Sequence, residues 1–579
     1  MFFNFTDYSN NTESNESSNW FKDFAEKRFG TDKKKSKGWA WWQVLLLTIL
    51  IMFLYFFFAL PSLSPQSKDF YTSIILGFIV YWVLYAVLGK RLKSFKSLKV
   101  SFGIVIAAIL LPILLELIAS PFFFSKQYAS LINVEDGDFA EDVDHINIKQ
   151  VPIVDREGAR VIGEKELGSV GGDIVSQFTI SQKYTQVNID EKPIRVTPLQ
   201  YYDLIKYFSN FQEGIQHYVS VDMHNQDGDL VKLDEPIYYS ESDIFLRDLD
   251  RHIRFQYPFY ILGNTEFEID DNGKAWYVTP HLYKPIFFFG GIETKGVILT
   301  DAHSGESHYY KMKDVPAWVD RVNPSDVVIQ QLDYYGKYKD GFWNSVISQR
   351  NVTSTTTGYN YISLGSDIYL TTGVTSVRAD ESNLGFYYVN LRTKETKFFQ
   401  VPSATETAAM QSAKGKVQEK NYDPTFPVIL NIGGRPVYFM SLKDQSKTAK
   451  LFALVDAQQF TDVIIGNTVE ETLTNYYEQN PNVISEQSSL IEDLEETVTV
   501  KDVSFLVEEG NTVYYFTVKE NDYIYKADPQ ELDPGIAFLE EGDKLKVITT
   551  NVVSEDEETK ETKDNKVKVK VVSKLGYIG

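Results

Sequence analysis

The pattern of apolar positions divides the chain into two unlike parts. Near the N-terminus three stretches are apolar at almost every position, at 39–60, 70–88 and 102–124. Each has about the 20 residues of helix that a hydrocarbon core requires. A buried helix of a soluble protein would keep a polar face, and a cleaved signal peptide would not be followed by two further spans. The pattern therefore predicts three transmembrane helices.

The basic residues that flank these spans predict their direction. Seven Lys or Arg residues precede the first span, only Lys68 lies between the first and second, and five lie between the second and third. Because basic loops stay in the cytoplasm, the N-terminus is expected inside and everything after about residue 125 outside. Residues 1–124 hold 13 basic and 8 acidic residues, whereas the whole chain has a net charge of −22. The predicted external part is therefore strongly acidic.

One carboxylate interrupts the third apolar stretch. Glu116 lies where a charge is costly, and such a residue is by default a candidate for function. A single acid without a basic partner in the membrane makes a poor relay. We expect a packing or partner-binding role, with the side chain turned toward polar groups such as Gln43, Tyr81 or Tyr85.

Beyond the spans the pattern changes to short alternating strands. Residues 125–150 are acidic and are interpreted as a linker, and 151–480 combine strands with stretches that predict helices at 198–211, 314–322 and 468–479. Residues 481–579 contain five or so short strands, a pattern similar to the small closed barrel of an OB-fold. The sequence thus predicts a cytoplasmic segment 1–38, a membrane region 39–124, an extracytoplasmic α+β region and a terminal β-barrel.

Composition and motifs exclude several kinds of chemistry. The chain has no cysteine, so thiolate catalysis, disulfides and cysteine-ligated metals are excluded. Its acidity argues against nucleic acid, whose phosphates select basic surfaces. The chain contains no phosphate-binding loop, no zinc-protease H-E-x-x-H and no G-x-S-x-G elbow. We therefore assign no catalytic residue and no cofactor.

The segment 300–310, TDAHSGESHYY, has the densest set of chemically active side chains. Asp301, His303 and His308 are candidate metal ligands, with Glu306 beside them. The chain has only seven histidines, so two of them five positions apart require an explanation.

A repeat of this segment favours a structural turn over a metal site. GVILTDAHSGESHYYKM, from Gly296, aligns with GFYYVNLRTKETKFFQV, from Gly385, and YVSVDMHNQDGDLVKL at 218–233 is a looser third copy. Arg392 and Lys397 replace the two histidines, and neither can ligate a metal. The turn residues are Asp301, Ser304, Gly305 and Glu306 in one copy and Asn390, Thr393 and Glu395 in the other. We expect Asp or Asn to cap each turn between two strands, with a solvent-facing basic side chain near each Glu.

The segment GVILTDAHSGESHYYKM resembles the PepSY module, in which an apolar strand is followed by D-A-x-T-G-E and a second strand. The copy at 385–401 departs from this pattern, with Asn390 for Asp and Lys394 for Gly. PepSY-like modules are extracytoplasmic α+β units, found also in propeptides that restrain secreted metalloproteases. More broadly, the chain resembles large membrane-anchored proteins of Gram-positive bacteria with tandem modules. The resemblance implies fold and location, and it transfers no catalytic residue.

These observations predict a non-enzymatic binding or scaffold protein of the cell envelope. Its partners would be the lipid bilayer and an envelope protein, and not nucleic acid. The alternative is a regulator or inhibitor of an extracellular or membrane peptidase, which would act through the PepSY-like modules. A hydrolase with a site assembled from distant residues and a transporter subunit acting through Glu116 are further alternatives.

Overall fold

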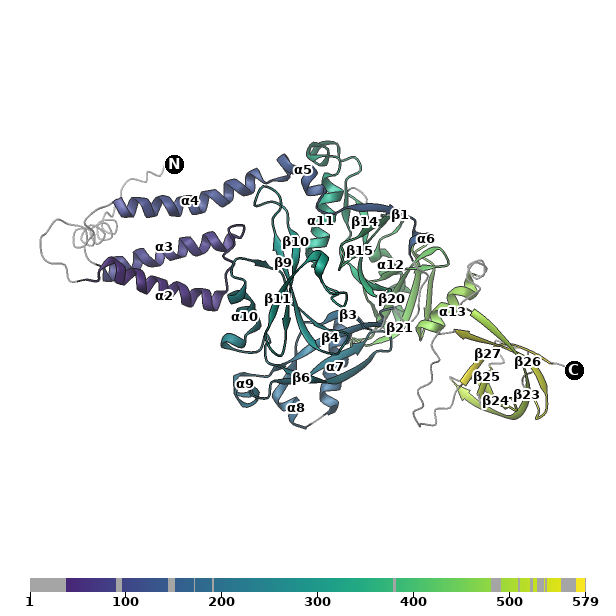
Figure 1. Cartoon of the computed structure of the whole chain (residues 1–579). Helices are drawn as coiled ribbons and strands as arrows, with labels where there is room; N and C mark the ends of the chain where they lie inside the picture. Colours follow the sequence, from purple (N-terminus) through teal and green to yellow (C-terminus); the bar gives the residue numbers. More distant parts are fainter. Residues whose placement is uncertain are drawn as a thin grey trace, which may run out of the picture.

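Three long apolar helices stand at one end of the molecule (Figure 1). They are α2 (Trp41–Ala59), α3 (Lys68–Leu88) and α4 (Lys96–Ile118). Each is long and apolar enough to cross a membrane, and few of its side chains are covered by the rest of the protein. The prediction of three helices of membrane-spanning length is confirmed. 

The computed structural model describes most of the chain. The described residues are 38–89, 96–143, 151–170, 172–189, 192–377, 382–480, 491–508, 511–520, 524–527, 536, 539–552 and 569–577. In Figure 1 a β-rich body follows the helices, and a separate β-barrel lies at the opposite end. 

The body contains four sheets, and each is preceded by a helix. We call these units modules 1 to 4, at residues 151–237, 238–311, 320–399 and 403–479. Module 1 contains α7 (Arg156–Val170), α8 (Gly172–Gln177), β2 (Phe178–Ile180), β3 (Thr185–Ile189), β4 (Lys192–Tyr201), α9 (Leu204–Asn210), β5 (Ile215–Asp222) and β6 (Asp227–Ile237). Module 2 contains η2 (Phe245–Arg247), α10 (Leu249–Gln256), β7 (Ile261–Leu262), β8 (Glu266–Ile269), β9 (Ala275–Tyr283), β10 (Glu293–Asp301) and β11 (Ser307–Lys311).

Modules 3 and 4 repeat this order of elements. Module 3 contains α11 (Ser325–Tyr338), η4 (Asn344–Ser348), β12 (Thr353–Thr355), β13 (Asn360–Leu364), β14 (Asp367–Ser376), β15 (Ser382–Asn390) and β16 (Thr396–Phe399). Module 4 contains α12 (Glu406–Lys416), η5 (Gln418–Lys420), β18 (Asp423–Pro424), β19 (Val428–Ile432), β20 (Arg435–Lys443), β21 (Ala449–Asp456), β22 (Val463–Gly466) and α13 (Val469–Gln479). In every module two short strands pair with the first long strand, and the remaining strands follow in antiparallel order. One apolar core runs through the modules.

The turn between the last two strands is capped in the same way in all four modules. Asp222, Asp301, Asn390 and Asp456 each accept, through one side-chain oxygen, the backbone N–H groups two and three residues ahead. The next residue is buried and accepts a backbone hydrogen bond from the segment that leads into the helix of its own module. The capped turn therefore also closes each module. 

The glycine that begins the two clear sequence copies is required by close backbone packing. A Cβ atom at Gly296 would lie 2.1 Å from the carbonyl oxygen of Tyr310, and one at Gly385 would lie 2.0 Å from that of Phe399. Both glycines lie beside a shift in strand register, at Thr294/Gly296 and at Val374/Thr375. The repeated glycine therefore marks a bulge that only a residue without a side chain can occupy.

Three stretches differ from the sequence interpretation. Of the helix expected at 198–211, residues 198–201 belong to strand β4 and only Leu204–Asn210 is helical. In the acidic segment interpreted as a linker, α5 (Pro121–Ala129) is followed by β1 (Val134–Gly137) and α6 (Phe139–Asp142), and β1 pairs in parallel with the edge strand β16. The helix expected at 314–322 is wrong. The backbone N–H groups of Asp320 and Arg321 bind the buried carboxylate of Glu268, so a tertiary contact takes the groups that a helix would bond internally.

The terminal region forms a closed barrel in the strand order β23-β24-β25-β27-β26. Its strands are β23 (Ile491–Glu508), β24 (Asn511–Val518), β25 (Ile524–Ala527), β26 (Lys544–Val552) and β27 (Val569–Tyr577). β25 and β27 are parallel, and the other neighbours are antiparallel. The barrel has its own core, in which the rings of Phe516 and Tyr525 stack.

Candidate functional site

The structure separates the three candidate metal ligands by their contacts. The carboxylate of Asp301 lies 2.9 Å from Lys274 Nζ, and the ring of His303 contacts the carbonyl oxygen of Pro236 through Nδ1 at 2.8 Å. His308 is exposed and lies 2.9 Å from Glu306. Within the described residues, no three His, Asp or Glu side chains are grouped closely enough to hold a metal ion. 

The equivalent positions in module 3 show what replaces these contacts. Asn390 donates to Asp367 at 2.7 Å, and Arg392, in the place of His303, forms an ion pair with the same carboxylate. Asp367 begins β14, at the position that Lys274 occupies before β9. His303 and Arg392 are half-buried and bind neighbouring groups, so the expectation of solvent-facing basic side chains fits His308 but not these two.

Replacing Asp301 by Asn is expected to cost less than replacing it by Ala. The Asn oxygen can still cap the turn, as Asn390 does, so the loss is about 1 kcal/mol or less; Ala removes the cap as well and costs about 2 kcal/mol. Burial opposes ionisation, but Lys274 and the turn N–H groups outweigh it and lower the pKa of Asp301. 

The stability due to this charge is therefore present above the ordinary carboxyl pKa, near about 4, and is lost as the pH falls through the lowered folded-state value. Urea unfolding of the full chain at about pH 7 and about pH 3 checks the effect. Wild type and Asp301→Asn should differ at neutral pH and converge in acid. An equal difference at both pH values would contradict it.

Glu116 has a basic partner that the sequence analysis did not assign. Lys68, the first residue of α3, lies 3.0 Å from its carboxylate near the end of α4. Both side chains are more than half exposed, at 63% and 54%. The ion pair joins the ends of α3 and α4 that adjoin the β-rich body, so the expected contacts with Gln43, Tyr81 or Tyr85 are replaced by this pair.

A pocket with a volume of about 490 Å³ lies where the four modules meet. It is lined by the beginnings of α7 and α11, by β3, β8 and β13, and by Phe426 of module 4. Hydrogen bonds between the modules hold this ring closed: Thr185 donates to Glu266, Asn360 donates to the carbonyl of Phe426, and Lys443 binds Asp155 at 2.6 Å. The second short strands of modules 1, 2 and 3, together with Phe426 of module 4, thus build the wall of a shared cavity.

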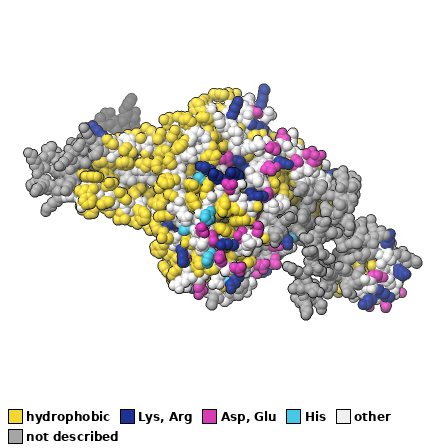
Figure 2. Space-filling model, in the orientation of Figure 1, with side chains coloured by type: hydrophobic (Ala, Val, Ile, Leu, Met, Phe, Trp, Pro, Cys, Tyr) yellow, Lys and Arg dark blue, Asp and Glu magenta, His cyan; other side chains and the backbone are white. Residues whose placement is uncertain are grey.

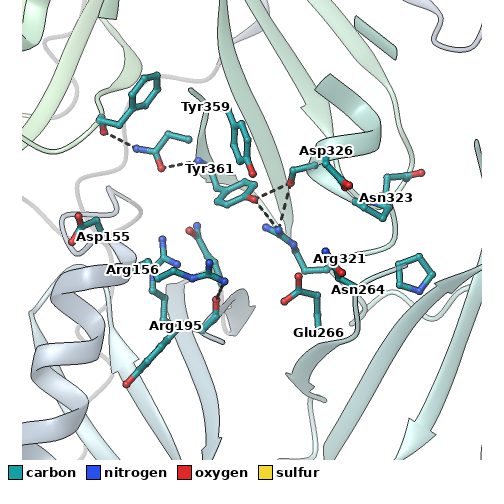
Figure 3. A pocket seen from close by; sticks show the side chains of 17 residues that line it. Asp155, Arg156, Arg195, Asn264, Glu266, Arg321, Asn323, Asp326, Tyr359 and Tyr361 are labelled. Atoms are coloured by element: carbon teal, nitrogen blue, oxygen red, sulfur yellow. Dashed lines mark hydrogen bonds between the residues drawn. The ribbon is translucent and has the colours of Figure 1, made fainter. Parts of the chain in front are cut away.

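Three arginines face this cavity, Arg156 and Arg195 from module 1 and Arg321 from module 3. Figure 3 shows Arg156 and Arg195 on one side of the cavity, and Arg321 beside Tyr361 on the other. Arg156 lies at the exposed rim, whereas Arg195 is only 6% exposed on the floor. None of the three forms an ion pair with a carboxylate in the described parts of the chain. A buried arginine without a carboxylate partner is costly unless another group neutralises it.

Several buried polar atoms on the floor have no hydrogen-bond partner in the described protein. They are Arg195 Nε, Arg321 Nη1 and both side-chain amide atoms of Gln186. Gln186 is only 1% exposed. Buried polar atoms are nearly always bonded in folded proteins, so this group can bind a polar ligand or ordered water.

The electrostatics of the pocket favour an anion on the Arg195 side. Burial lowers the pKa of Arg195 to about 10; Tyr361 and Asp155 oppose this shift, whereas the nearby charges of Arg156 and Arg321 add to it. Asp155 is drawn toward Lys443 and also caps the first turn of α7 through the N–H of Gly158. An oxyanion between the arginines would reduce their mutual repulsion and supply the missing acceptors. 

The opposite wall is more balanced in charge and carries aromatic rings. Arg321 lies over the ring of Tyr361 at 4.2 Å and donates to its hydroxyl at 2.8 Å. Burial opposes ionisation of Arg321, but Tyr361, Glu266 and Glu268 outweigh it and raise its pKa. Together with the exposed ring of Tyr359, this wall can stack on a flat or sugar-like group while the floor binds its acidic part.

A pair of buried carboxyl groups supports this wall from behind. Glu268 accepts the N–H groups of Asp320 and Arg321 at 3.0 Å each, and Asp320 accepts the N–H of Asn188 at 2.7 Å. Burial raises the pKa of both groups well above the ordinary range, and the charge of Asp320 adds to the rise at Glu268. These contacts join modules 1, 2 and 3 and fix Arg321 at the edge of the pocket. 

Sequence reasoning did not find this pocket, because its residues are spread from Asp155 to Phe426. One local signal was available: Arg195 stands between Ile194 and Val196 in an otherwise apolar strand, PIRVTPL. Comparison of the chain with models of known protein families and with curated proteins finds no match.

Proposed function

We propose that this protein is a membrane-anchored binding protein, and that its four-module body holds a ligand with an oxyanion group in the arginine pocket. The observation that carries this proposal is Arg195, a buried cation with an unpartnered Nε that lies beside two other arginines. The chemistry that fits is a phosphate or carboxylate group carried on a hydroxyl-bearing or flat body. No catalytic step is assigned to the pocket.

The location and family of the body are part of the same proposal. The alternation of basic loops supports an extracytoplasmic body with a cytoplasmic N-terminus, as in a protein of the cell envelope of Gram-positive bacteria. The repeated order of helix and five strands supports PepSY-like modules, and the strand order of the terminal barrel supports an OB-like domain. The fold of the modules carries the pocket without determining its ligand.

A binding measurement with the purified full chain tests the proposal. Inorganic phosphate, glycerol phosphate and glucuronate are titrated by calorimetry and by thermal unfolding. At least one should bind, and Arg195→Met should abolish the binding, because the floor then lacks its cation. Arg160→Met is the matched control: Arg160 also belongs to module 1, but it pairs with Glu164 on the exposed face of α7. Equal binding by both variants, or no binding of any of the three anions, would overturn the proposal.

Regulation of a peptidase is the second candidate, favoured by the four tandem modules that resemble PepSY units. Such a regulator would bind through a module surface and not through the central pocket. Complex formation with secreted metalloproteases, followed by size-exclusion chromatography, distinguishes the two. A complex that forms equally well with Arg195→Met would support the regulator, and the lack of any complex would remove it.

A further inference from the structure

The β-rich body carries an apolar surface on the side from which the three long helices leave it. Figure 2 shows apolar side chains continuing from the helices onto the adjoining part of the body. Six of them belong to α9, η2 and the loop after α10, and each is at least 60% exposed: Leu204, Ile205, Phe208, Phe245, Leu246 and Phe259. We call these six residues the juxtahelical surface. 

A continuous series of contacts joins this surface to the end of α2. Arg251 on α10 donates through Nε to the carbonyl oxygen of Phe57 at 2.9 Å and through Nη1 to that of Phe245 at 2.5 Å. Arg247 of η2 donates to the carbonyl oxygen of Phe211, which follows α9, at 2.7 Å. The end of α2, η2 and α9 are therefore neighbours, and the juxtahelical surface begins where the apolar surface of α2 ends.

Several contacts fix the position of the β-rich body relative to the ends of the three helices. Leu63 N–H donates to the carbonyl of Pro258 at 2.8 Å, and the Gln66 amide donates to the carbonyl of Lys284 at 2.9 Å. Just after α4, the carbonyl oxygen of Ala119 accepts from the hydroxyl of Tyr128 on α5 at 2.8 Å, and the ring of Tyr128 packs against that of Tyr334 on α11. These contacts link the ends of α2, α3 and α4 to the body without a long linker, so the body lies close to the ends of the three helices.

The backbone supports the outward direction of these rings. Phe245 has a φ of 54°, a left-handed conformation that is costly for a bulky residue. The hydrogen bond from Arg251 to its carbonyl holds this conformation, and the ring is 64% exposed as a result. A large apolar surface facing water is rare unless it binds something.

We propose that the juxtahelical surface lies in the interfacial layer of the same bilayer that α2, α3 and α4 cross. The occupant is lipid because the surface is continuous with helices that lipid surrounds and lies at the level of their ends. Exposed Phe, Leu and Ile side chains on one side of a short helix are typical of interfacial segments. Contact of this surface with lipid would then fix the tilt of the β-rich body relative to the bilayer, as well as its distance from it. The proposal does not depend on the arginine pocket.

Single labels in the full chain test this proposal directly. The chain has no cysteine, so Ile205→Cys, Phe245→Cys and the control Glu419→Cys each give one site for a fluorophore. Glu419 is exposed on η5 of module 4, which lies away from the long helices in Figure 1. Each labelled protein is placed in phosphatidylcholine nanodiscs, with either ordinary or brominated acyl chains, and iodide serves as the quencher in water.

The labels at 205 and 245 should lose most of their fluorescence with brominated lipid and should be protected from iodide. The label at 419 should show the reverse. Quenching of the first two labels by iodide alone would place the surface in water and overturn the proposal. Protection from both quenchers would also overturn it, because a second copy of the chain or another protein would then cover the surface.

Discussion

Replacing Arg195 by Met is expected to stabilise the unliganded protein by about 1–4 kcal/mol. The side chain is 6% exposed, its Nε has no partner in the described protein, and the nearest cations repel it. Met has a similar length and no charge to desolvate, so the floor of the pocket exchanges an uncompensated cation for apolar contacts. The free energy of unfolding should therefore rise even though a polar residue has been removed.

The measurement is urea unfolding of wild type, Arg195→Met and Arg160→Met in a buffer free of phosphate and carboxylate. Arg160 pairs with Glu164 at the surface, so its variant should change the free energy by no more than about 0.5 kcal/mol. A saturating anion should then stabilise the wild type alone, by mass action on the folded state. If Arg195→Met instead destabilises the protein by several kcal/mol, the arginine is a structural element and not a ligand-binding group.

Arg195 and Glu406, the first residue of α12, are two unlike kinds of buried charge in this protein. Arg195 lies at a cavity and its Nε has no hydrogen-bond partner in the described protein, so only a ligand can compensate the cost of burying it. Glu406 lies in a closed interface and is surrounded by donors. The same class of substitution should therefore change stability in opposite directions at the two positions.

Local features of this chain could be predicted from the sequence. The three apolar spans were found because a membrane requires an apolar surface all round a helix. The Asn272-Gly273 dipeptide is typical of a hairpin turn, and in the structure Gly273 adopts a positive φ of 77° between β8 and β9. The helix at 468–479 begins with the capping contacts that its Thr-x-x-Glu sequence indicates: the Thr468 hydroxyl accepts the N–H of Glu471, and the Glu471 carboxylate accepts the N–H of Asn467. Each of these depends on residues close together in the chain.

Features that depend on distant residues were missed. The fourth capped turn, at Asp456, has no Gly or aromatic pair to align with TDAHSGESHYY, although its hydrogen bonds are the same. The segment 314–322 has helical spacing, but Glu268 takes its backbone N–H groups. The pocket requires the ring of four modules, and no local pattern indicates which arginines would meet there.

Replacing Glu406 by Ala is expected to destabilise the protein by about 3–5 kcal/mol. Glu406 begins α12 of module 4, and its buried carboxylate enters the sheet of module 3. It accepts the N–H of Gly373 at 2.8 Å, the hydroxyl of Thr356 at 3.1 Å and the amide of Asn383 at 3.3 Å. Alanine would leave these three buried donors without an acceptor and open a cavity between the two modules.

Two further variants separate the lost hydrogen bonds from lost volume. Glu406→Gln keeps the side-chain volume, but the amide has one acceptor oxygen where the carboxylate has two. Its NH2 group would also face the donors that surround this position, so the substitution should still cost about 1–3 kcal/mol. Glu419→Ala, at an exposed acidic position of the same module, should stay within about 0.5 kcal/mol of wild type. Urea unfolding at neutral pH measures all three. A loss below about 1 kcal/mol for Glu406→Ala would show that modules 3 and 4 are held together by apolar packing and not by this carboxylate.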